Sequence, residues 1–575
     1  MRGKNRKGKK EKKTEKDTSY FEQGTIIKRG KNLIRTALVY PNTYKAGMSS
    51  LGFQTVYALI NGMESVACER VFLPAGDIKQ DRIKSCETGM ALSLFDIIAF
   101  SISFENDYVN LISILKNSGI PPRASRRDPS LPLVIAGGVA CFLNPEPLAP
   151  FVDIFLLGEA EFLIREFFDL YDPAMDKDNL KHLMARELSG AYVPSFYSPA
   201  YTDSGQLTGI KPLYNDIPQT INIRYVEDLD TIKTASVIVT PKTVFKNLFL
   251  IETGRGCPHG CRFCSAGFIY RPPRFYPEEG VINAMDEVKN MTDKIGLVSA
   301  AVSDHPGINK ICAMGIKKGF KISFSSLRVD ALTDDLINSL AMSGVKTATI
   351  APEAGSEKMR RVINKKIKED DILSAAERLV NAGIINLKLY FMIGLPFEQE
   401  DDVRAIVVLT EKIMEKFLAA SRKKKKIGTI TLSINPFIPK PSTPFQWVPM
   451  APAHTLKNRL KMIKQGLKTV SNIHVKSESL RTARINALLS RGDRRMADIL
   501  ENASEKGWNR AIGQAQDYCH SQLYAERRID DALAWDILDT GIKKTFLLKE
   551  FLRAEKEKTS DDCPMVQCEK CHICR

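Results

Sequence analysis

The sequence predicts an α/β protein built from an N-terminal doubly wound parallel-sheet (Rossmann-like) domain, a partial (β/α)6 barrel and a C-terminal helical region with a cysteine-rich tail. Short apolar runs alternate with helical patterns over residues 30–173, and the alternation returns over residues 246–450. Apolar strands separated by helices form parallel sheets covered on both faces. We therefore divide the 575-residue chain into a disordered basic tail, an α/β domain, a bridging segment, the barrel, a helical domain and a metal-binding tail, at residues 1–24, 25–173, 174–245, 246–452, 453–558 and 559–575.

The N-terminal domain is predicted from four apolar strands and the helices between them. The strands are expected at residues 33–40, 96–103, 133–136 and 153–157, and the helices near 49–62, 107–117 and 159–171. Gly137 and Gly138 follow the third strand, where glycine lets the backbone approach a ligand or a helix closely. Doubly wound sheets bind ligands at the carboxyl ends of their strands, so we expect a ligand crevice there.

The barrel is predicted from six strand–helix units. The strands are expected at residues 248–252, 296–302, 321–325, 347–351, 386–393 and 429–435, with helices such as 278–291, 334–343, 368–382 and 400–417 between them. The chemistry of a β/α barrel lies at the carboxyl ends of its strands. Loops that follow these strands are therefore the first places to look for a site.

The positive charge of the chain is unevenly placed. The formal net charge is +16, and residues 1–16 hold nine Lys or Arg and two Glu, which gives this tail +7. A second basic run is Lys423 to Lys426. These runs either contact RNA phosphates or are solvated charge that keeps the protein soluble. No aromatic residues interleave the tail as a base-stacking surface requires, which favours the second interpretation.

The chain shows no segment that predicts membrane insertion or secretion. No stretch approaches 18 uncharged apolar residues, and no apolar segment follows the Lys-rich start as in a signal peptide. We therefore expect a cytoplasmic protein with no membrane partner. Seven of the twelve cysteines fall into two tight groups, at residues 257–264 and 563–574. In a cytoplasmic protein such grouping indicates metal rather than disulfides.

The first cysteine group follows the first predicted barrel strand. Cys257, Cys261 and Cys264 have the spacing C-x3-C-x2-C, and the glycines and proline around them let one loop curl round a single cluster. Thiolates are soft ligands that suit iron–sulfur clusters. The alternative is structural zinc, which usually takes four ligands, and for which His259 is the nearest candidate to complete the set.

Three protein ligands for a 4Fe–4S cluster leave one iron open. That iron can bind the amino and carboxylate groups of S-adenosylmethionine (SAM), and electron transfer from the cluster then splits the C–S bond and yields a 5′-deoxyadenosyl radical. In such a site the radical chemistry belongs to the cofactor, while the protein positions it and excludes water.

The cysteine loop and the strand ends after it resemble the radical SAM superfamily. The resemblance implies SAM contacts at the strand ends, although residues 296–303 lack the Gly-Gly-Glu motif that the family often carries there. Taken one by one, such residues more often serve packing, but together, in order and after the cysteine loop, they favour function. The implied roles are an aromatic residue beside the cluster and adenine for Phe263, strand-end positions for Ser303, Ser325 and Arg328, SAM ribose or amine for Glu353, SAM carboxylate for Arg360, and adenine for Ile393 and Gly394.

An α/β domain before such a barrel resembles the cobalamin-binding radical SAM class, and within it an uncharacterised subfamily. Similar stretches are residues 40–54, 103–108, 137–138, 144–147, 158–159 and 491–495. Residues 1–181 contain no histidine, so an imidazole ligand to cobalt from this domain is excluded. Two interpretations stay open: cobalamin bound without such a ligand, and a domain used for packing or substrate binding.

A third interpretation of the N-terminal domain is that Cys68, Cys86 and Cys141 hold a second cluster. Methylthiotransferases hold a second cluster with three cysteines in a comparable domain, which makes a methylthiotransferase-like enzyme an alternative function. Lone cysteines are more often small buried apolar residues.

The second cysteine group forms the tail. Cys563, Cys568, Cys571 and Cys574 have the spacing C-x4-C-x2-C-x2-C, and four thiolates so close together indicate a metal. The ferredoxin-like run favours a second 4Fe–4S cluster, with structural zinc as the alternative. Residues 543–558 before it predict an exposed amphipathic helix and a mobile tail.

The sequence thus favours an enzyme that cleaves SAM with a 4Fe–4S cluster and modifies an unknown macromolecule or metabolite, by methylation or another radical reaction. It needs an electron donor such as a flavodoxin or ferredoxin. The competing hypothesis is a non-catalytic, metal-containing RNA-binding module. No motif names the substrate, because specificity depends on pocket shape.

Overall fold

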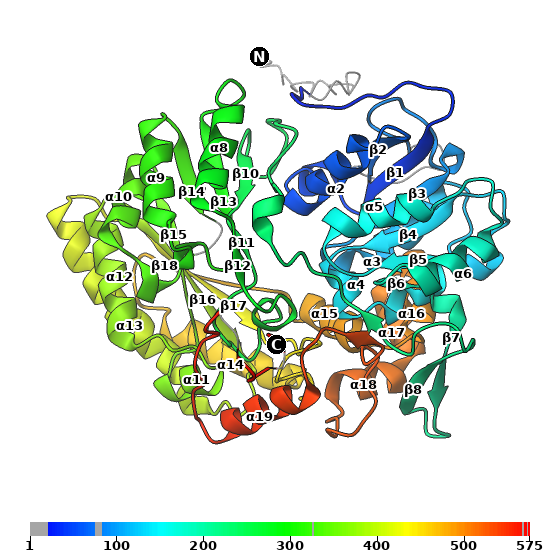
Figure 1. The fold of residues 1–575 in the computed structure, drawn as a ribbon. Helices are drawn as coiled ribbons and strands as arrows, with labels where there is room; N and C mark the ends of the chain where they lie inside the picture. The colour runs from blue at the N-terminus through cyan, green and yellow to red at the C-terminus, as the bar shows by residue number, and fades with distance from the viewer. Residues whose placement is uncertain (1–20, 75–82, 325–326, 566–567, 572, 575) are drawn as a thin grey trace, which may run out of the picture.

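Two α/β bodies lie side by side, and the C-terminal segments run beneath both of them (Figure 1). This computed structural model describes residues 21–74, 83–324, 327–565, 568–571 and 573–574. The predicted basic tail up to residue 20 and the predicted site residue Ser325 lie outside these ranges. Among the described residues, no helix combines the length and apolar character needed to cross a membrane.

The N-terminal sheet has the strand order β2-β1-β3-β4-β5-β6. Its first five strands are parallel, and β6 joins the edge antiparallel to β5. The order reverses between β1 and β3, and doubly wound sheets bind ligands at such a switch point. The predicted fold class is confirmed. The strands are β1 (Ile34–Tyr40), β2 (Val66–Phe72), β3 (Ile97–Ser101), β4 (Leu133–Gly137), β5 (Ile154–Leu156) and β6 (Ala191–Tyr192).

Helices of this domain pack against both neighbouring parts of the chain. α2 (Leu51–Gly62) contacts α5 (Ala160–Leu170) and the first barrel strand, whereas α3 (Tyr108–Asn117) packs against α16 (Met496–Lys506) of the C-terminal region. The N-cap Ser50 fixes the start of α2 by accepting a hydrogen bond from the backbone N–H of Phe53. The remaining helices are α1 (Tyr44–Gly47), α4 (Val139–Leu143) and α6 (Lys177–Glu187).

Strand β2 is absent from the sequence prediction because Glu69 and Arg70 interrupt its apolar pattern. All seven of its residues are nevertheless buried. Arg70 enters the interior as a paired charge, with Glu22 at 2.7 Å and Glu87 at 2.6 Å. A buried charge is tolerated when such partners satisfy it.

The barrel consists of two parallel sheets, β10-β13-β14 and β15-β16-β17-β18. In the described part of the chain no hydrogen bonds join β14 to β15, so the barrel stays partial. The strands are β10 (Phe249–Glu252), β13 (Lys294–Val298), β14 (Lys321–Phe324), β15 (Thr347–Glu353), β16 (Asn386–Ile393), β17 (Ile430–Pro436) and β18 (Ile473–Ser477), and the helices between them are α8 (Glu278–Val288), α9 (Ile308–Lys317), α10 (Asp334–Met342), α11 (Glu357–Val362), α12 (Glu369–Asn381) and α13 (Glu400–Lys423).

The barrel differs from the prediction in two strands. β18 lies in the region predicted to be helical and adds a seventh strand, which pairs in parallel with β17. It is a five-residue edge strand with polar residues, too short for its pattern to stand out. The second strand, predicted at residues 296–302, ends at Val298, because the chain then leaves the sheet and forms a short 3₁₀ turn at Val302–Asp304.

The predicted bridging segment, residues 174–245, begins with α6 and β6, which belong to the N-terminal domain, and continues as short strands. β7 (Tyr197–Tyr201) and β8 (Leu207–Pro212) form an antiparallel pair, and β9 (Ile221–Asn222) pairs with β19 (Leu538–Asp539) near the C-terminus. The C-terminal region is otherwise helical, as predicted. Its remaining helices are α14 (Ala453–Gly466), α15 (Leu480–Arg491), α17 (Trp508–Gln514), α18 (Gln516–Tyr524) and α19 (Lys544–Glu555).

Two sequence stretches, residues 144–147 and 491–495, form a contact between the N-terminal domain and the C-terminal helices. The Asn144 side chain donates to the backbone carbonyls of Ser490 and Gly492. Arg494 pairs with Glu146 at 2.9 Å and donates to the Tyr192 hydroxyl at 2.7 Å. The Glu146 side chain is fully buried. These stretches therefore hold two parts of the chain together.

Candidate functional site

The three loop cysteines lie on a short excursion from the first barrel strand. β11 (Gly254–Arg255) pairs with β12 (Arg274–Phe275), and this pairing closes the base of the loop that carries the cysteines and α7 (Ala266–Ile269). Gly256 has φ +78°, and a Cβ there would lie 2.4 Å from the Tyr270 carbonyl oxygen. The sharp turn before Cys257 therefore requires glycine.

The three thiols form one electrostatic group. Burial raises the pKa of Cys257 to about 12 and that of Cys264 to about 11, and repulsion from the neighbouring cysteines adds to both shifts. Burial likewise raises the pKa of Cys261. Thiolates held this close in a buried loop are strongly stabilised by a cation, since the thiolate is the form that binds metal. The donor set, three soft sulfurs on one loop, fits an iron–sulfur cluster.

His259 has carboxylate neighbours on both ring nitrogens. Its Nε2 lies 2.8 Å from Asp304 Oδ2 and its Nδ1 lies 3.1 Å from Asp562 Oδ2. Burial opposes protonation of the ring, but these two contacts outweigh it and raise the pKa of His259. Ligand atoms of Cys257, His259 and Asp304 also lie within 4.8 Å of one another, so these three residues are the set that could hold zinc in the alternative interpretation. An imidazole engaged by two carboxylates is poorly placed to act as a fourth ligand.

Two of the predicted SAM-contact residues lie in the electrostatic surroundings of Cys261. Arg328 and Glu353 both act on the pKa of that thiol, as does Lys365, which the sequence analysis missed. Lys365 Nζ lies 3.9 Å from Glu353 Oε1. Glu353 has φ +66°, a strained value for a residue other than glycine, and burial raises its pKa. Strain of this kind gathers at functional sites, so Glu353 stays the strongest predicted contact.

Phe263 and Ser303 border this group. Phe263 is half-buried and packs on an apolar cluster that includes Val362 and Phe437. The Ser303 hydroxyl accepts a hydrogen bond from the Arg328 backbone N–H at 3.2 Å. Ser303 thus positions the chain segment that carries Arg328.

The Arg360 side chain forms hydrogen bonds to the backbone just after the end of β15. Its guanidinium donates to the backbone carbonyls of Ala354, Gly355 and Ile367. The side chain is almost fully buried. These bonds shape the turn after Glu353, whereas the buried Arg360 Nη2 makes no hydrogen bond within the described residues, so the implied carboxylate contact stays a prediction.

Ile393 and Gly394 end β16 as predicted. The Ile393 side chain is buried in the main core, which leaves its backbone for any ligand contact. Gly394 has φ +83°, and its N–H donates to Glu398 Oε2 at 2.7 Å. Arg459 pairs with the same carboxylate at 2.6 Å. Glu398 and Arg459 were missed because they are 61 residues apart and no motif joins them.

A cavity of about 460 Å³ lies between the N-terminal domain and the barrel. It opens at the carboxyl ends of the N-terminal strands, where Ser101, Ser103, Gly137 and Gly138 line it, and it reaches Tyr270 of the cysteine loop. Its deeper walls are apolar. Phe53, Val56, Leu163, Ile164 and Phe167 contribute to them. The expected ligand crevice is therefore present, and it is continuous with the cysteine loop.

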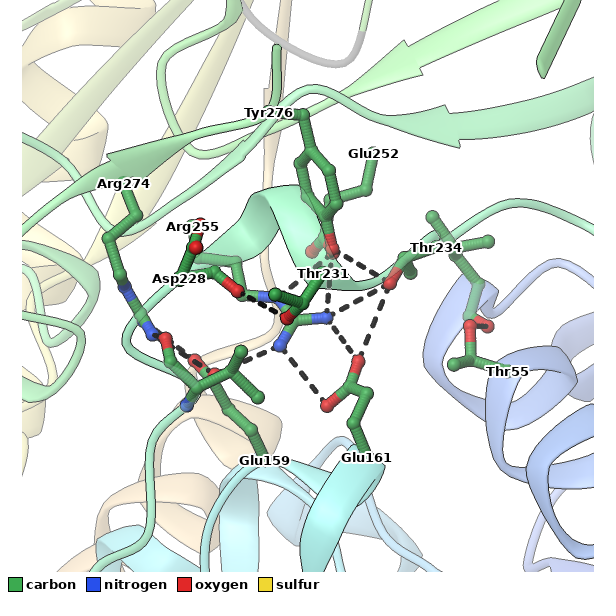
Figure 2. A network of polar contacts seen from close by, with 12 residues as sticks. Thr55, Glu159, Glu161, Asp228, Thr231, Thr234, Glu252, Arg255, Arg274 and Tyr276 are labelled. Carbon is green, nitrogen blue, oxygen red and sulfur yellow. Dashed lines mark hydrogen bonds and ion pairs between the residues drawn. The ribbon is translucent and has the colours of Figure 1, made fainter. Parts of the chain in front are cut away.

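Arg255 joins the two sides of this cavity (Figure 2). Its guanidinium contacts Glu159 at 2.9 Å and Glu161 at 2.5 Å from the N-terminal domain, and Glu252 at 2.9 Å from the barrel. Arg274 pairs with Glu159 from the other side at 2.7 Å. Three carboxylates thus meet two guanidinium groups two residues before Cys257. Burial raises the pKa of Glu252, the carboxylate at the end of β10.

The other N-terminal cysteines lie in two separate surroundings. Burial raises the pKa of Cys68 and Cys86, and both lie near Glu87 and Arg70. The pKa of Cys141 is raised by burial alone. A second cluster held by these three residues therefore gains no support from their placement.

The four tail cysteines lie together beside the cysteine loop. Burial raises the pKa of Cys574, and Cys571, Cys563 and Cys568 raise it further. A cavity of about 180 Å³ borders three of them together with Gly260 of the loop. The predicted mobile tail is wrong as far as Cys563, because α19 buries Leu547 and Ala554 and the backbone N–H of Cys563 donates to the Pro258 carbonyl.

Known proteins share both halves of this arrangement. Residues 52–194 match the family described as "Radical SAM proteins, N-terminal", and residues 251–410 match the "Radical SAM superfamily". The chain is 31% identical over 487 residues to Uncharacterized protein MJ0966 of Methanocaldococcus jannaschii, covering 83% of this chain and 92% of that protein. It is 23% identical over 294 residues to Uncharacterized methyltransferase PH0819 of Pyrococcus horikoshii, covering 49% of this chain and 58% of that protein.

Solved structures show a weaker likeness. The radical S-adenosylmethionine methyltransferase TsrM from Kitasatospora setae, with tryptophan and a SAM analogue bound, has a TM-score of 0.48 and 13% identity, covering 84% of this chain and 99% of that one. The cobalamin-dependent S-adenosylmethionine radical enzyme OxsB has a TM-score of 0.44 and 16% identity, covering 68% and 56%. From its two matched regions and its archaeal relative, the chain belongs to the radical SAM superfamily of enzymes.

Proposed function

We propose that the protein binds a 4Fe–4S cluster through Cys257, Cys261 and Cys264 and uses it to cleave SAM. The observation that carries this is the single buried group of three thiols at the carboxyl end of β10. Such a cluster, with one iron open to SAM, supplies the electron that breaks the sulfonium C–S bond. Lys365, Arg328 and Glu353 all act electrostatically on the pKa of Cys261, which supports a role for these charged groups in orienting the amino acid end of SAM.

We further propose that the cavity between the two domains receives a corrinoid and that the reaction is a methylation. The apolar depth suits an aromatic base, and the wall of Glu159, Glu161 and Glu252 offers acceptors to amide side chains. A corrinoid supplies a cobalt that can carry a methyl group. The cavity volume of about 460 Å³ is typical of a small-molecule site. Because a corrinoid is larger than this, the cavity would enclose only one end of it. The methyltransferase label of PH0819 supports the same reaction class.

Anaerobic reconstitution tests the first proposal. Protein loaded with iron and sulfide, then given dithionite and SAM, should release methionine with 5′-deoxyadenosine, or S-adenosylhomocysteine if methyl transfer is the reaction. Metal analysis of protein purified without oxygen is the companion measurement. Zinc on the loop, or iron-loaded protein that leaves SAM intact, would refute the proposal.

Substituting Gly52 tests the corrinoid site. Gly52 lines the cavity from α2, and a Cβ there meets no atom within 4 Å, so Gly52→Leu is accommodated by the backbone. The leucine should fill part of the cavity mouth and weaken hydroxocobalamin binding by about tenfold or more, since one obstructed apolar contact is worth 1–3 kcal/mol. The measurement is corrinoid absorbance retained after gel filtration over a range of concentrations.

Gly62→Leu is the matched control. Gly62 lies at the other end of the same helix, also meets no atom within 4 Å of a built Cβ, and does not line the cavity. It should leave corrinoid binding unchanged. Equal binding by wild type and both variants would place the corrinoid elsewhere or exclude it.

A further inference from the structure

The ligands of the two cysteine groups are joined by one residue and one hydrogen bond. The backbone N–H of Cys563 donates to the carbonyl oxygen of Pro258 at 2.7 Å. Pro258 follows Cys257 directly. A path of covalent bonds broken by a single short hydrogen bond therefore runs from the first tail cysteine to the first loop cysteine.

Side chains form a second connection beside this one. Asp562 pairs with His259 of the loop at 3.1 Å and with Lys366 at 2.7 Å. Asn364 bridges the same gap, because its Nδ2 donates to the Gly260 carbonyl at 3.1 Å and its Oδ1 accepts from the Ser560 N–H at 2.8 Å. The segment just before Cys563 is therefore fixed to the loop by side chains as well as by the Cys563 backbone contact.

Arg262 anchors the start of the tail. Its side chain has 0% exposure, and it pairs with Glu550 of α19 at 3.1 Å. It also donates to the Lys558 carbonyl at 2.7 Å and to the Ser560 hydroxyl at 3.2 Å. Because Arg262 lies between two loop cysteines, the tail and the loop form one packed unit.

The exposed side of α19 and its flanks carries more bases than acids. Lys543, Lys549, Lys556 and Lys558 are exposed there against Glu555, while the tail itself exposes Asp561 and Glu569 beside Lys570. Arg271 acts on Cys574 and stabilises its thiolate form. An acidic protein approaching this surface meets complementary charge, which speeds association at low salt.

We infer that the four tail cysteines hold a second iron–sulfur cluster through which electrons reach the loop cluster. The inference rests on the proposed function, since the loop cluster must donate an electron to SAM and then be reduced again. A reduced flavodoxin-type donor loses one electron, the tail cluster takes it up, and the loop cluster receives it along the Cys563–Pro258–Cys257 path. Each step moves one electron, and no proton or group changes place at the tail.

A double variant, Cys568→Ser with Cys571→Ser, tests the relay. It should lose about four irons per chain and keep the loop cluster. Reduction of that cluster by photoreduced flavodoxin, followed by low-temperature EPR on freeze-quenched samples, should slow by about tenfold or more, whereas reduction by dithionite should be unchanged. Cys86→Ser, which removes a half-buried cysteine of the N-terminal domain, is the control for sulfur loss.

The bridge can be tested with both clusters in place. Asp562→Asn keeps the size of the side chain but removes its charge pairs with His259 and Lys366. It should slow flavodoxin-driven reduction and leave iron content unchanged. Asp561→Asn is the matched control, because Asp561 is highly exposed and pairs with the exposed Lys570.

Two results would overturn the relay. One is zinc in the tail of protein purified without oxygen, because zinc has no redox chemistry. The other is equal flavodoxin-driven rates in wild type and the double cysteine variant. Either result leaves SAM cleavage by the dithionite-reduced loop cluster intact, so failure of the relay is distinguishable from failure of the proposed function.

Discussion

Cys261→Ala is expected to abolish SAM cleavage while leaving the tail metal in place. Cys261 is the central and most enclosed of the three loop cysteines. Two thiolates do not hold a cubane that already lacks a fourth protein ligand, so the iron content should fall by about four atoms per chain. Formation of 5′-deoxyadenosine or S-adenosylhomocysteine should drop to the background level. Iron and sulfide analysis, EPR and product chromatography measure the three effects.

Cys312→Ala is the matched control for this variant. Cys312 is a fully buried cysteine of α9, outside both cysteine groups. Its replacement should leave cluster content and SAM cleavage near the wild-type values. If Cys261→Ala kept full iron and turnover, the loop would not be the cluster site.

Arg494→Ala is expected to destabilise the contact between the N-terminal domain and the C-terminal helices. The substitution leaves the Glu146 carboxylate buried without its cation and removes a donor to the Tyr192 hydroxyl. Breaking a buried ion pair on one side typically costs about 3–5 kcal/mol. Urea denaturation followed by circular dichroism should show an earlier first transition.

Two further variants separate this effect from loss of an arginine in general. Arg404→Ala removes a highly exposed arginine that pairs with Asp401 on α13, and surface pairs of this kind contribute about 0–1 kcal/mol. Glu146→Gln in the Arg494→Ala background should restore part of the lost stability, because an amide does not need a cation. An Arg494→Ala midpoint equal to that of Arg404→Ala would contradict the assignment.

The sequence was sufficient for most of the fold because most strands are plainly apolar. β16, for example, alternates regularly between half-buried and buried residues, and its bounds match the prediction. β2 was missed because Arg70 is neutralised by Glu22 and Glu87, residues that only the fold brings together. β18 was missed because an edge strand needs little apolar sequence.

For the candidate site, too, some residues could be predicted from the sequence and others could not. The cysteines form local motifs, so spacing alone predicted both groups. Lys365 and Glu398 lie in the connections that follow β15 and β16, but they belong to no motif and only the fold shows what they contact. For Arg360 the motif position implied a ligand contact, and the fold adds that two of its nitrogens bind backbone carbonyls while Nη2 makes no hydrogen bond within the described residues.

The buried charges around Arg255 have a consequence for how large ligands exchange. Parting the two domains would strip Arg255 from Glu159 and Glu161 and leave all three facing an incomplete set of partners. Unpaired charges in a poorly solvated gap cost free energy, so these ion pairs resist separation of the two domains. A large molecule held in the cavity beside these ion pairs is therefore expected to dissociate slowly and to stay with the protein through many turnovers.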